Sequence, residues 1–125
     1  MDHRAFTYLL FVSGATHCAL SCRRVAKVTA VDQGEATDWL DPESLGLGRA
    51  EGETTRLLWL TESSRKSPLP IGGSCRLAIV PPEDVLPLPA LHRRLTPFSA
   101  LLHSAEGSAL LLEPDALGSR LPHPV

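Results

Sequence analysis

Three residues whose side chains can bind metal lie close together near the N-terminus: His17, Cys18 and Cys22. Imidazole and thiolate groups are the usual ligands of Zn²⁺. Structural zinc sites, however, bring their ligands as closely spaced pairs, and the only other thiol, Cys75, lies far along the chain. In a strand, His17 and Cys18 would also point to opposite faces. The pattern therefore favours buried cysteines that act as small hydrophobic residues, with no metal.

The sequence contains none of the common catalytic motifs, such as the GxSxG nucleophile elbow, the phosphate-binding P-loop, the GxGxxG dinucleotide loop or the HExxH zinc motif. The glycine pair in IGGSC, residues 71–75, is typical of a turn that leads into a strand. We therefore expect a protein that is not an enzyme, without catalytic residues or a cofactor. A small metal- or thiol-dependent enzyme that uses Cys18, Cys22 or Cys75 remains the alternative.

The composition is that of an ordinary globular protein of one domain. The chain has 125 residues, of which 43% are hydrophobic and 21% are charged. Its formal net charge of -2 creates no overall field toward nucleic acid, so we expect no nucleic-acid partner. Three cysteines, an odd number, do not form a disulfide framework. Eleven prolines and nine glycines divide the chain into short pieces, which favours an all-β fold with short helical turns.

The N-terminal stretch has some features of a secretion signal, because basic residues precede the apolar run AFTYLLFV. Asp2 offsets the one certain positive charge, and Thr7 and Tyr8 interrupt a run that is already short. No run approaches the roughly 20 apolar residues that a membrane-spanning helix needs. We expect a cytoplasmic protein without membrane insertion, and a secreted β domain is the further alternative.

The opening of the chain predicts a β-hairpin. Residues 6–12 are aromatic, β-branched and apolar, and they end at the turn signal SGAT of residues 13–16. After the turn, Cys18, Leu20 and Cys22 share one face at a period of two, so we expect them to point inward. The valines of the next segment, at positions 25, 28 and 31, are expected to point inward as well.

Further short elements follow with turn signals between them. Asp41 to Gly46 has an N-cap, a proline at the first helical position and a terminal glycine, which predicts a single helical turn. The prolines of residues 81–89 exclude a helix and predict an extended edge segment. Glu106-Gly107 predicts a hairpin within residues 100–112. Strands are also predicted at 56–61 and 75–80, loops at 32–38 and 63–70, and a second short turn at 113–118.

The order of these pieces resembles the CheW-like family, the coupling proteins of bacterial chemosensory pathways. The similarity begins in AFTYLLFVSGATHCALSCRRVAKV, continues in WLDPESLGLG and TTRLLWLT, and extends through GGSCRLAIVPPEDVLPLP to SAEGSALLLEPDALG. The resemblance implies an all-β, CheW-like fold of two small SH3-like β-barrel subdomains. It also implies one domain over residues 1–125, with approximately residues 1–55 and the C-terminal strand region forming mixed subdomains.

One departure from the family pattern lies between the valine segment and residue 39. The family carries a proline-rich loop and a G-x-x-x-x-R-G-x-x-x-P-V core there, and residues 32–39 are too few to hold them. The chain therefore resembles a shortened coupling protein of the FrzB type, with the first barrel truncated. The loss is expected to expose a sheet edge, which proteins cover by pairing, by a loop or by forming a homodimer.

The resemblance implies a non-enzymatic adaptor and names its partners. These are the signalling domain of a methyl-accepting chemoreceptor, and the regulatory domain of a CheA-type histidine kinase or another CheW-like protein. We expect the kinase contact to be the one lost through the shortening. The implied partner-binding residues lie near an apolar groove, although each would serve equally well as a core residue: Val25, Val28 and Val31, with Leu86 and Leu88 as weaker candidates.

Overall fold

The computed structural model describes residues 6–31, 40–49, 54–61, 68–105 and 107–114. These residues form short strands with a few short helical turns, which confirms the all-β expectation. The elements in chain order are β1 (Phe6–Ser13), β2 (Thr16–Ser21), the 3-10 turn η1 (Cys22–Arg24), β3 (Val25–Ala30), β4 (Thr54–Leu60), β5 (Leu69–Val80), the 3-10 turn η3 (Pro82–Asp84), β6 (Val85–Pro87), α1 (Ala90–Leu95), β7 (Phe98–Ser104) and β8 (Gly107–Leu112).

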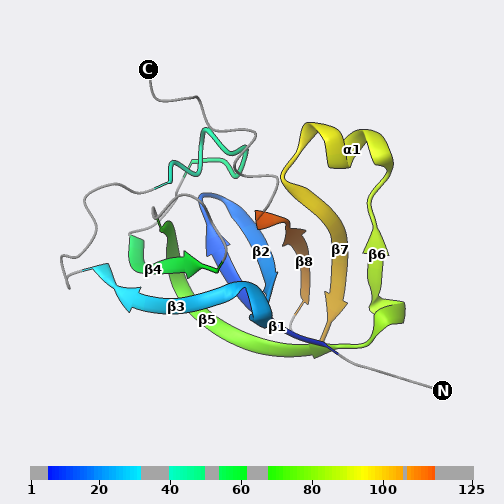
Figure 1. The fold of residues 1–125 in the computed structure, drawn as a ribbon, viewed down its shortest axis with the longest axis horizontal. Coiled ribbons are helices and arrows are strands. Elements are labelled where there is room, and N and C mark those ends of the chain that lie inside the picture. Colours follow the sequence, from blue (N-terminus) through cyan, green and yellow to red (C-terminus); the bar gives the residue numbers. More distant parts are fainter. Residues whose placement is uncertain (1–5, 32–39, 50–53, 62–67, 106, 115–125) are drawn as a thin grey trace.

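The strands in the described part of the chain form one eight-stranded sheet, in the order β3-β4-β5-β1-β2-β8-β7-β6 (Figure 1). Neighbouring strands are antiparallel except β2 and β8, which are parallel. The long strand β5 pairs with β4 through its first residues and with β1 through its last. It therefore links the two halves of the sheet, and Figure 1 shows it curving along one side of the molecule.

The hairpin of β1 and β2 is held by a close approach to the segment 41–48. Gly14, in the turn, has φ of 60°, in the left-handed region that favours glycine. A Cβ at Gly14 would lie 2.4 Å from the carbonyl oxygen of Gly48. The backbone N–H of Ala15 donates to the carbonyl of Leu47, with 2.9 Å between nitrogen and oxygen. Both the conformation and the contact therefore require glycine in this turn.

The single helical turn expected from Asp41 is present. The Asp41 carboxylate accepts hydrogen bonds from the backbone N–H of Glu43 (3.1 Å) and the hydroxyl of Ser44 (2.8 Å). Gly46 ends the turn with φ of 83°, as expected for a glycine at a helical C-terminus. The turn places Leu45 in the interior, so the polar cap positions an apolar anchor.

Buried side chains form two cores. The members of the first core are Leu9, Phe11, Cys18, Leu20, Leu40, Leu45, Leu47, Leu58, Leu69, Ile71, Phe98 and Leu112. The members of the second core are Tyr8, Ala19, Ala78, Val80, Leu102 and Ala109.

Strands β1, β2 and β8 contribute to both cores through alternate residues. In β1, Leu9 belongs to the first core and Tyr8 to the second, while in β2 the same division separates Leu20 from Ala19. Successive side chains of a strand point to opposite faces, so these three neighbouring strands are buried on both sides. We call β1, β2 and β8 the central wall, because one core packs on each of its faces.

The expected turn at the glycine pair of residues 71–75 is wrong, because β5 is continuous from Leu69 to Val80. Leu10 of β1 pairs with Arg76 of β5, and Val12 pairs with Gly72. Between these two pairs β1 advances by two residues while β5 advances by four, so β5 has extra residues at this point. The glycines therefore lie where β5 bends from one partner strand to the other. Glycine suits a strand bend or bulge as well as it suits a turn, and the local sequence does not distinguish the two.

The proline-rich segment is only in part as expected. Val85–Pro87 is the edge strand predicted within 81–89, but Pro82–Asp84 forms a 3-10 turn with proline at its start, where no helix was expected. Proline is well tolerated there because the first N–H groups of a helical turn are unpaired in any case. The short helix Ala90–Leu95 was not predicted. The predicted loop at 32–38 and most of the predicted turn at 113–118 lie outside the described residues.

Replacing Leu20 by alanine should lower the free energy of unfolding by about 2–5 kcal/mol, because the side chain is fully buried in the central wall and its loss leaves a cavity. Leu77 lies one strand beyond Leu9 in the same row and is 65% exposed. The control Leu77→Ala should therefore change stability by no more than about 0.5 kcal/mol. Urea unfolding of both variants measures the difference. Equal losses of unfolding free energy in the two variants would contradict the burial of Leu20 in the central wall.

Replacing Gly14 by alanine should destabilise the protein more than replacing Gly46. Both glycines have positive φ, which costs an alanine about 1–2 kcal/mol. A Cβ at Gly46 meets nothing within 4 Å, whereas one at Gly14 overlaps backbone. Thermal unfolding of the two variants compares them, and similar melting temperatures would show that the approach to Gly48 is not tight.

Candidate partner-binding surface

Two of the three valines predicted as partner contacts lie on the border of the first core. Val25 and Val28, in β3, are half-buried and pack against this core, opposite Leu60 and Leu58 in β4. Val31 follows the strand and is also half-buried. Val25 and Val28 therefore line the inner side of β3, and all three valines keep part of their surface exposed.

The two leucines predicted as weaker candidates do not lie together. Leu88 is half-buried and packs against the first core, like Val25 and Val28. Leu86 is 44% exposed on β6, which stands at the opposite end of the strand order from β3. The described structure thus associates Leu88 with the valines through a shared core and places Leu86 on a different edge.

Two exposed apolar side chains on β5 were missed by the sequence reasoning. Leu77 and Ile79 are 65% and 71% exposed, and we call them the β5 stripe. Pairing places Leu20, Leu9 and Leu77 in one row across β2, β1 and β5. Leu20 and Leu9 are buried, so the row passes from core to solvent at β5. The sequence does carry a signal, because residues 77–80 are all apolar and so place apolar side chains on both faces of the strand. In the structure the face of Ala78 and Val80 is buried, and the face of Leu77 and Ile79 is exposed.

The β5 stripe lies at the same end of the first core as the start of β3. Ile79, in β5, pairs with Thr7, in β1. On the other side of β1, Cys22 lies two residues after Leu20 of β2, at the start of η1. The N–H of Thr61 donates to the carbonyl of Arg24 (2.9 Å), which ties the end of β4 to η1. We call the partly covered residues at this end the rim of the first core: Cys22, Val25, Leu60, Leu77 and Ile79.

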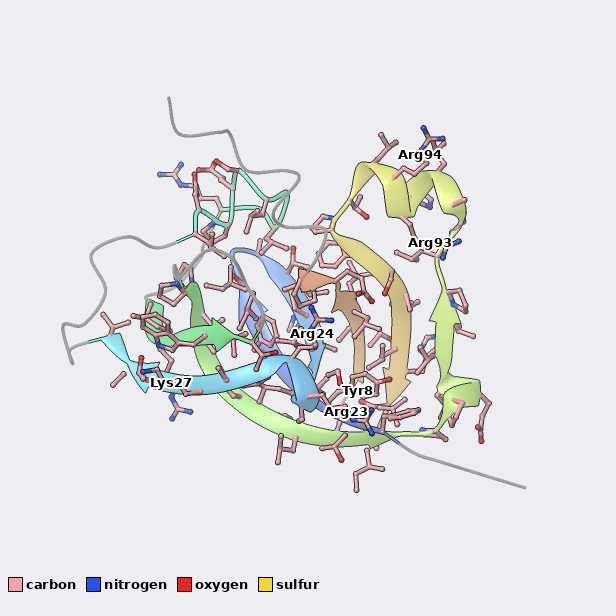
Figure 2. All side chains as sticks on the ribbon, viewed as in Figure 1. Tyr8, Arg23, Arg24, Lys27, Arg93 and Arg94 are labelled. Atoms are coloured by element: carbon pink, nitrogen blue, oxygen red, sulfur yellow. The ribbon has the colours of Figure 1, made fainter. Side chains whose placement is uncertain are left out.

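Basic side chains border the rim. Arg23 and Lys27 are exposed on η1 and β3, whereas Arg76, which precedes Leu77 in sequence, is exposed on the opposite face of β5. The Lys27 ammonium lies 4.9 Å from the centre of the Trp59 ring, a distance at which a cation and an aromatic face attract. Figure 2 shows Arg23, Arg24 and Lys27 along η1 and β3. An apolar surface with a basic border favours a partner that combines apolar anchors with acidic residues.

The surroundings of Cys18 and Cys22 do not favour a reactive thiol. Burial raises the pKa of Cys18 to about 12, against a smaller opposing effect of a backbone hydrogen bond from Ser13. Burial also raises the pKa of Cys22. A nucleophilic cysteine needs a lowered pKa, so burial opposes that role for Cys18 and Cys22. His17 is exposed while its neighbour Cys18 is buried, on the opposite face of β2. Within the described ranges, no group of three or more His, Cys, Asp or Glu residues could hold a metal ion.

No family model matches the sequence, and no curated protein matches it significantly. Among solved structures, the fold is similar to that of the scaffolding protein TtCheW from Thermoanaerobacter tengcongensis, with a TM-score of 0.57 and 13% sequence identity. The match covers 87% of this chain and 89% of that chain. The likeness is one of fold, and it confirms the expected class: all-β and CheW-like. Of the helices in the described residues, none is long and apolar enough to cross a membrane.

The raised pKa of Cys18 predicts a loss of stability at high pH. The folded state holds the thiol proton up to a pKa of about 12, whereas the unfolded chain releases it near the ordinary value of 9.0. Stability that depends on this thiol is therefore complete below pH 9 and falls as the pH rises toward about 12. Urea unfolding of wild type and Cys18→Ala across this range should show a steeper loss for wild type, and parallel profiles would contradict the burial effect.

Proposed function

We propose that this chain is a non-enzymatic adaptor of a chemosensory pathway, a single CheW-like domain over residues 1–125 that acts in the cytoplasm. The observation that carries the proposal is the β5 stripe. Leu77 and Ile79 are exposed at the end of the first core, and Leu77 is in line with the buried Leu9 of the central wall. Exposed apolar residues that continue a core are typical of a surface that a partner completes. The likeness to a scaffolding protein adds support at the level of architecture.

The partner that we propose for the rim is the signalling domain of a methyl-accepting chemoreceptor. An amphipathic helix binds such a surface through aliphatic anchors at helical spacing, with its polar face toward the border. The basic residues Arg23 and Lys27 would meet acidic residues on that helix. Apolar contacts that exclude water supply most of the affinity, while the charges orient the partner and speed its approach.

The second contact of a CheW-like adaptor would be with the regulatory domain of a CheA-type kinase or with another CheW-like protein. We propose that a FrzB-type shortening of the first half has removed the kinase contact. The described sheet ends at β3 on this side, next to the short segment 32–39. Val25, Val28 and Val31 are retained as receptor contacts, and Leu88 borders the same core. Leu86 lies on the other edge and is the weakest of the five predicted residues.

Replacing Leu77 and Ile79 together by serine should weaken receptor binding about tenfold or more. Burial of one aliphatic side chain contributes about 1.5–3 kcal/mol, and a tenfold change in affinity corresponds to about 1.4 kcal/mol. Isothermal titration calorimetry with a purified receptor signalling domain from the same organism measures the effect. The fold should be kept, because both side chains are exposed.

The matched control is Leu91→Ser, since Leu91 is 63% exposed on α1 and lies outside the rim. This variant should bind the receptor domain like wild type. If wild-type protein bound no receptor signalling domain, no kinase regulatory domain and no other CheW-like protein, the adaptor proposal would be wrong. An equal loss of receptor affinity in the control and in the double variant would show that the β5 stripe is not the contact surface.

A further inference from the structure

Strand β5 has an open edge over its last residues. Within the described residues, β4 pairs with β5 from Leu69 to Gly72 only, whereas β1 pairs with it as far as Val80 on the other side. No described strand therefore lies beside Leu77 and Ile79 on the side away from β1. Figure 1 shows this half of β5 along the lower border of the molecule. We call the side of residues 77–80 that faces away from β1 the β5 edge.

The register of the first hairpin determines which backbone groups of β5 point to this edge. Only two residues separate the last pair of β1 and β2, and the pair that flanks a two-residue turn is hydrogen-bonded. Because hydrogen-bonded and non-hydrogen-bonded pairs alternate in an antiparallel ladder, Leu9 and Thr7 direct their backbone groups to β2. Their partners in β5 are Leu77 and Ile79. The N–H and C=O groups of these two residues thus point away from β1, to the β5 edge.

The β5 edge lacks the features that normally prevent strand addition. Leu77 and Ile79 are 65% and 71% exposed, and residues 77–80 include neither proline nor a charged residue. The two ends of the described sheet are better protected, because β3 carries the exposed Lys27 and β6 contains Pro87, which has no N–H. Among the described strands, the β5 edge therefore offers donors, acceptors and apolar side chains together.

The β5 edge is complementary to a second copy of itself. If two copies pair antiparallel about a two-fold axis at Ala78, Leu77 of each copy lies opposite Ile79 of the other. Both pairs are then of the hydrogen-bonded kind, because the N–H and C=O groups of these residues point outward. The aliphatic side chains of the two pairs also lie next to each other on one face, and such cross-strand pairs stabilise a sheet. Arg76 lies opposite Val80 of the other copy, so the two arginines do not face each other.

We propose that this protein forms a homodimer by antiparallel pairing of β5 with β5 of a second copy, in the register that places Leu77 opposite Ile79. A second copy supplies the matching donors, acceptors and aliphatic side chains by symmetry, and every favourable pair occurs twice. This dimer differs from the one expected at the truncated first barrel, which concerned the edge at β3. Strand pairing occupies the edge of β5 and leaves the outer face of the β5 stripe open. The inference therefore does not rest on the adaptor function.

Amide hydrogen exchange at increasing protein concentration tests the pairing directly. The amides of Leu77 and Ile79 should exchange more slowly as the concentration rises, because they bond to the second copy only in the dimer. The amides of Ala78 and Val80 point to β1 in monomer and dimer alike, so their exchange should change little. Sedimentation velocity should show a monomer–dimer equilibrium over the same range. A protein that stays monomeric at all concentrations, or exchange that does not alternate along β5, would overturn the proposal.

Two charged double variants test the register. Leu77→Lys/Ile79→Lys places like charges opposite each other twice, so it should dimerise about tenfold or more weakly than wild type in sedimentation velocity. Leu77→Glu/Ile79→Lys places opposite charges in the same pairs and should dimerise about tenfold or more tightly than the first variant. Both side chains are exposed, so the fold should be kept.

The matched control is Leu91→Lys, on the exposed surface of α1, which should dimerise like wild type. Equal dimerisation of the two charged double variants would overturn the proposed pairing. Dimerisation is measured without receptor, so its absence would leave the adaptor proposal standing, and a failure to bind receptor would leave the dimer standing.

Discussion

The structure depends on a wall of three strands that is buried on both faces. Leu9 and Leu20 face one core, while Tyr8 and Ala19, their neighbours in sequence, face the other. A one-residue shift in the pairing of β1 with β2 would exchange these faces throughout. Gly14 fixes that register, because its turn conformation and its contact with Gly48 leave no room for a side chain. The wall therefore couples the two halves of the sheet.

The candidate binding surface is a consequence of how the rest of the sheet meets this wall. β5 bends near Gly72 so that it can pair with β4 and then with β1. The paired strands β3 and β4 pack in the first core together with Leu9 and Leu20, but they leave Leu77 and Ile79 exposed. An apolar row that is buried in two strands is thus open in the third. The adaptor role that we propose requires an exposed apolar surface of this kind, since an adaptor acts through contacts with its partners.

Much of the local structure could be predicted from the sequence. The run of aromatic, β-branched and apolar residues at 6–12 and the turn signal after it predict the first hairpin, and Asp41 with Gly46 predicts the helical turn. The glycines near 72 were misread because a strand bend and a turn use the same residue. Exposure of Leu77 and Ile79 depends on which strand covers which, and local pattern carries no such information. For the same reason Leu86 could not be separated from Leu88.

Native-state hydrogen exchange tests most directly whether the central wall makes the two halves one unit. Slowly exchanging amides in β4, in β1 and β2, and in β7 should share one free energy of opening, equal to that of global unfolding, since neither core keeps its wall when the other is lost. They should also respond equally to low concentrations of urea. If β6, β7 and β8 opened at a distinctly lower free energy while β3 and β4 stayed protected, the two halves would be independent and the account of a shared wall would be wrong.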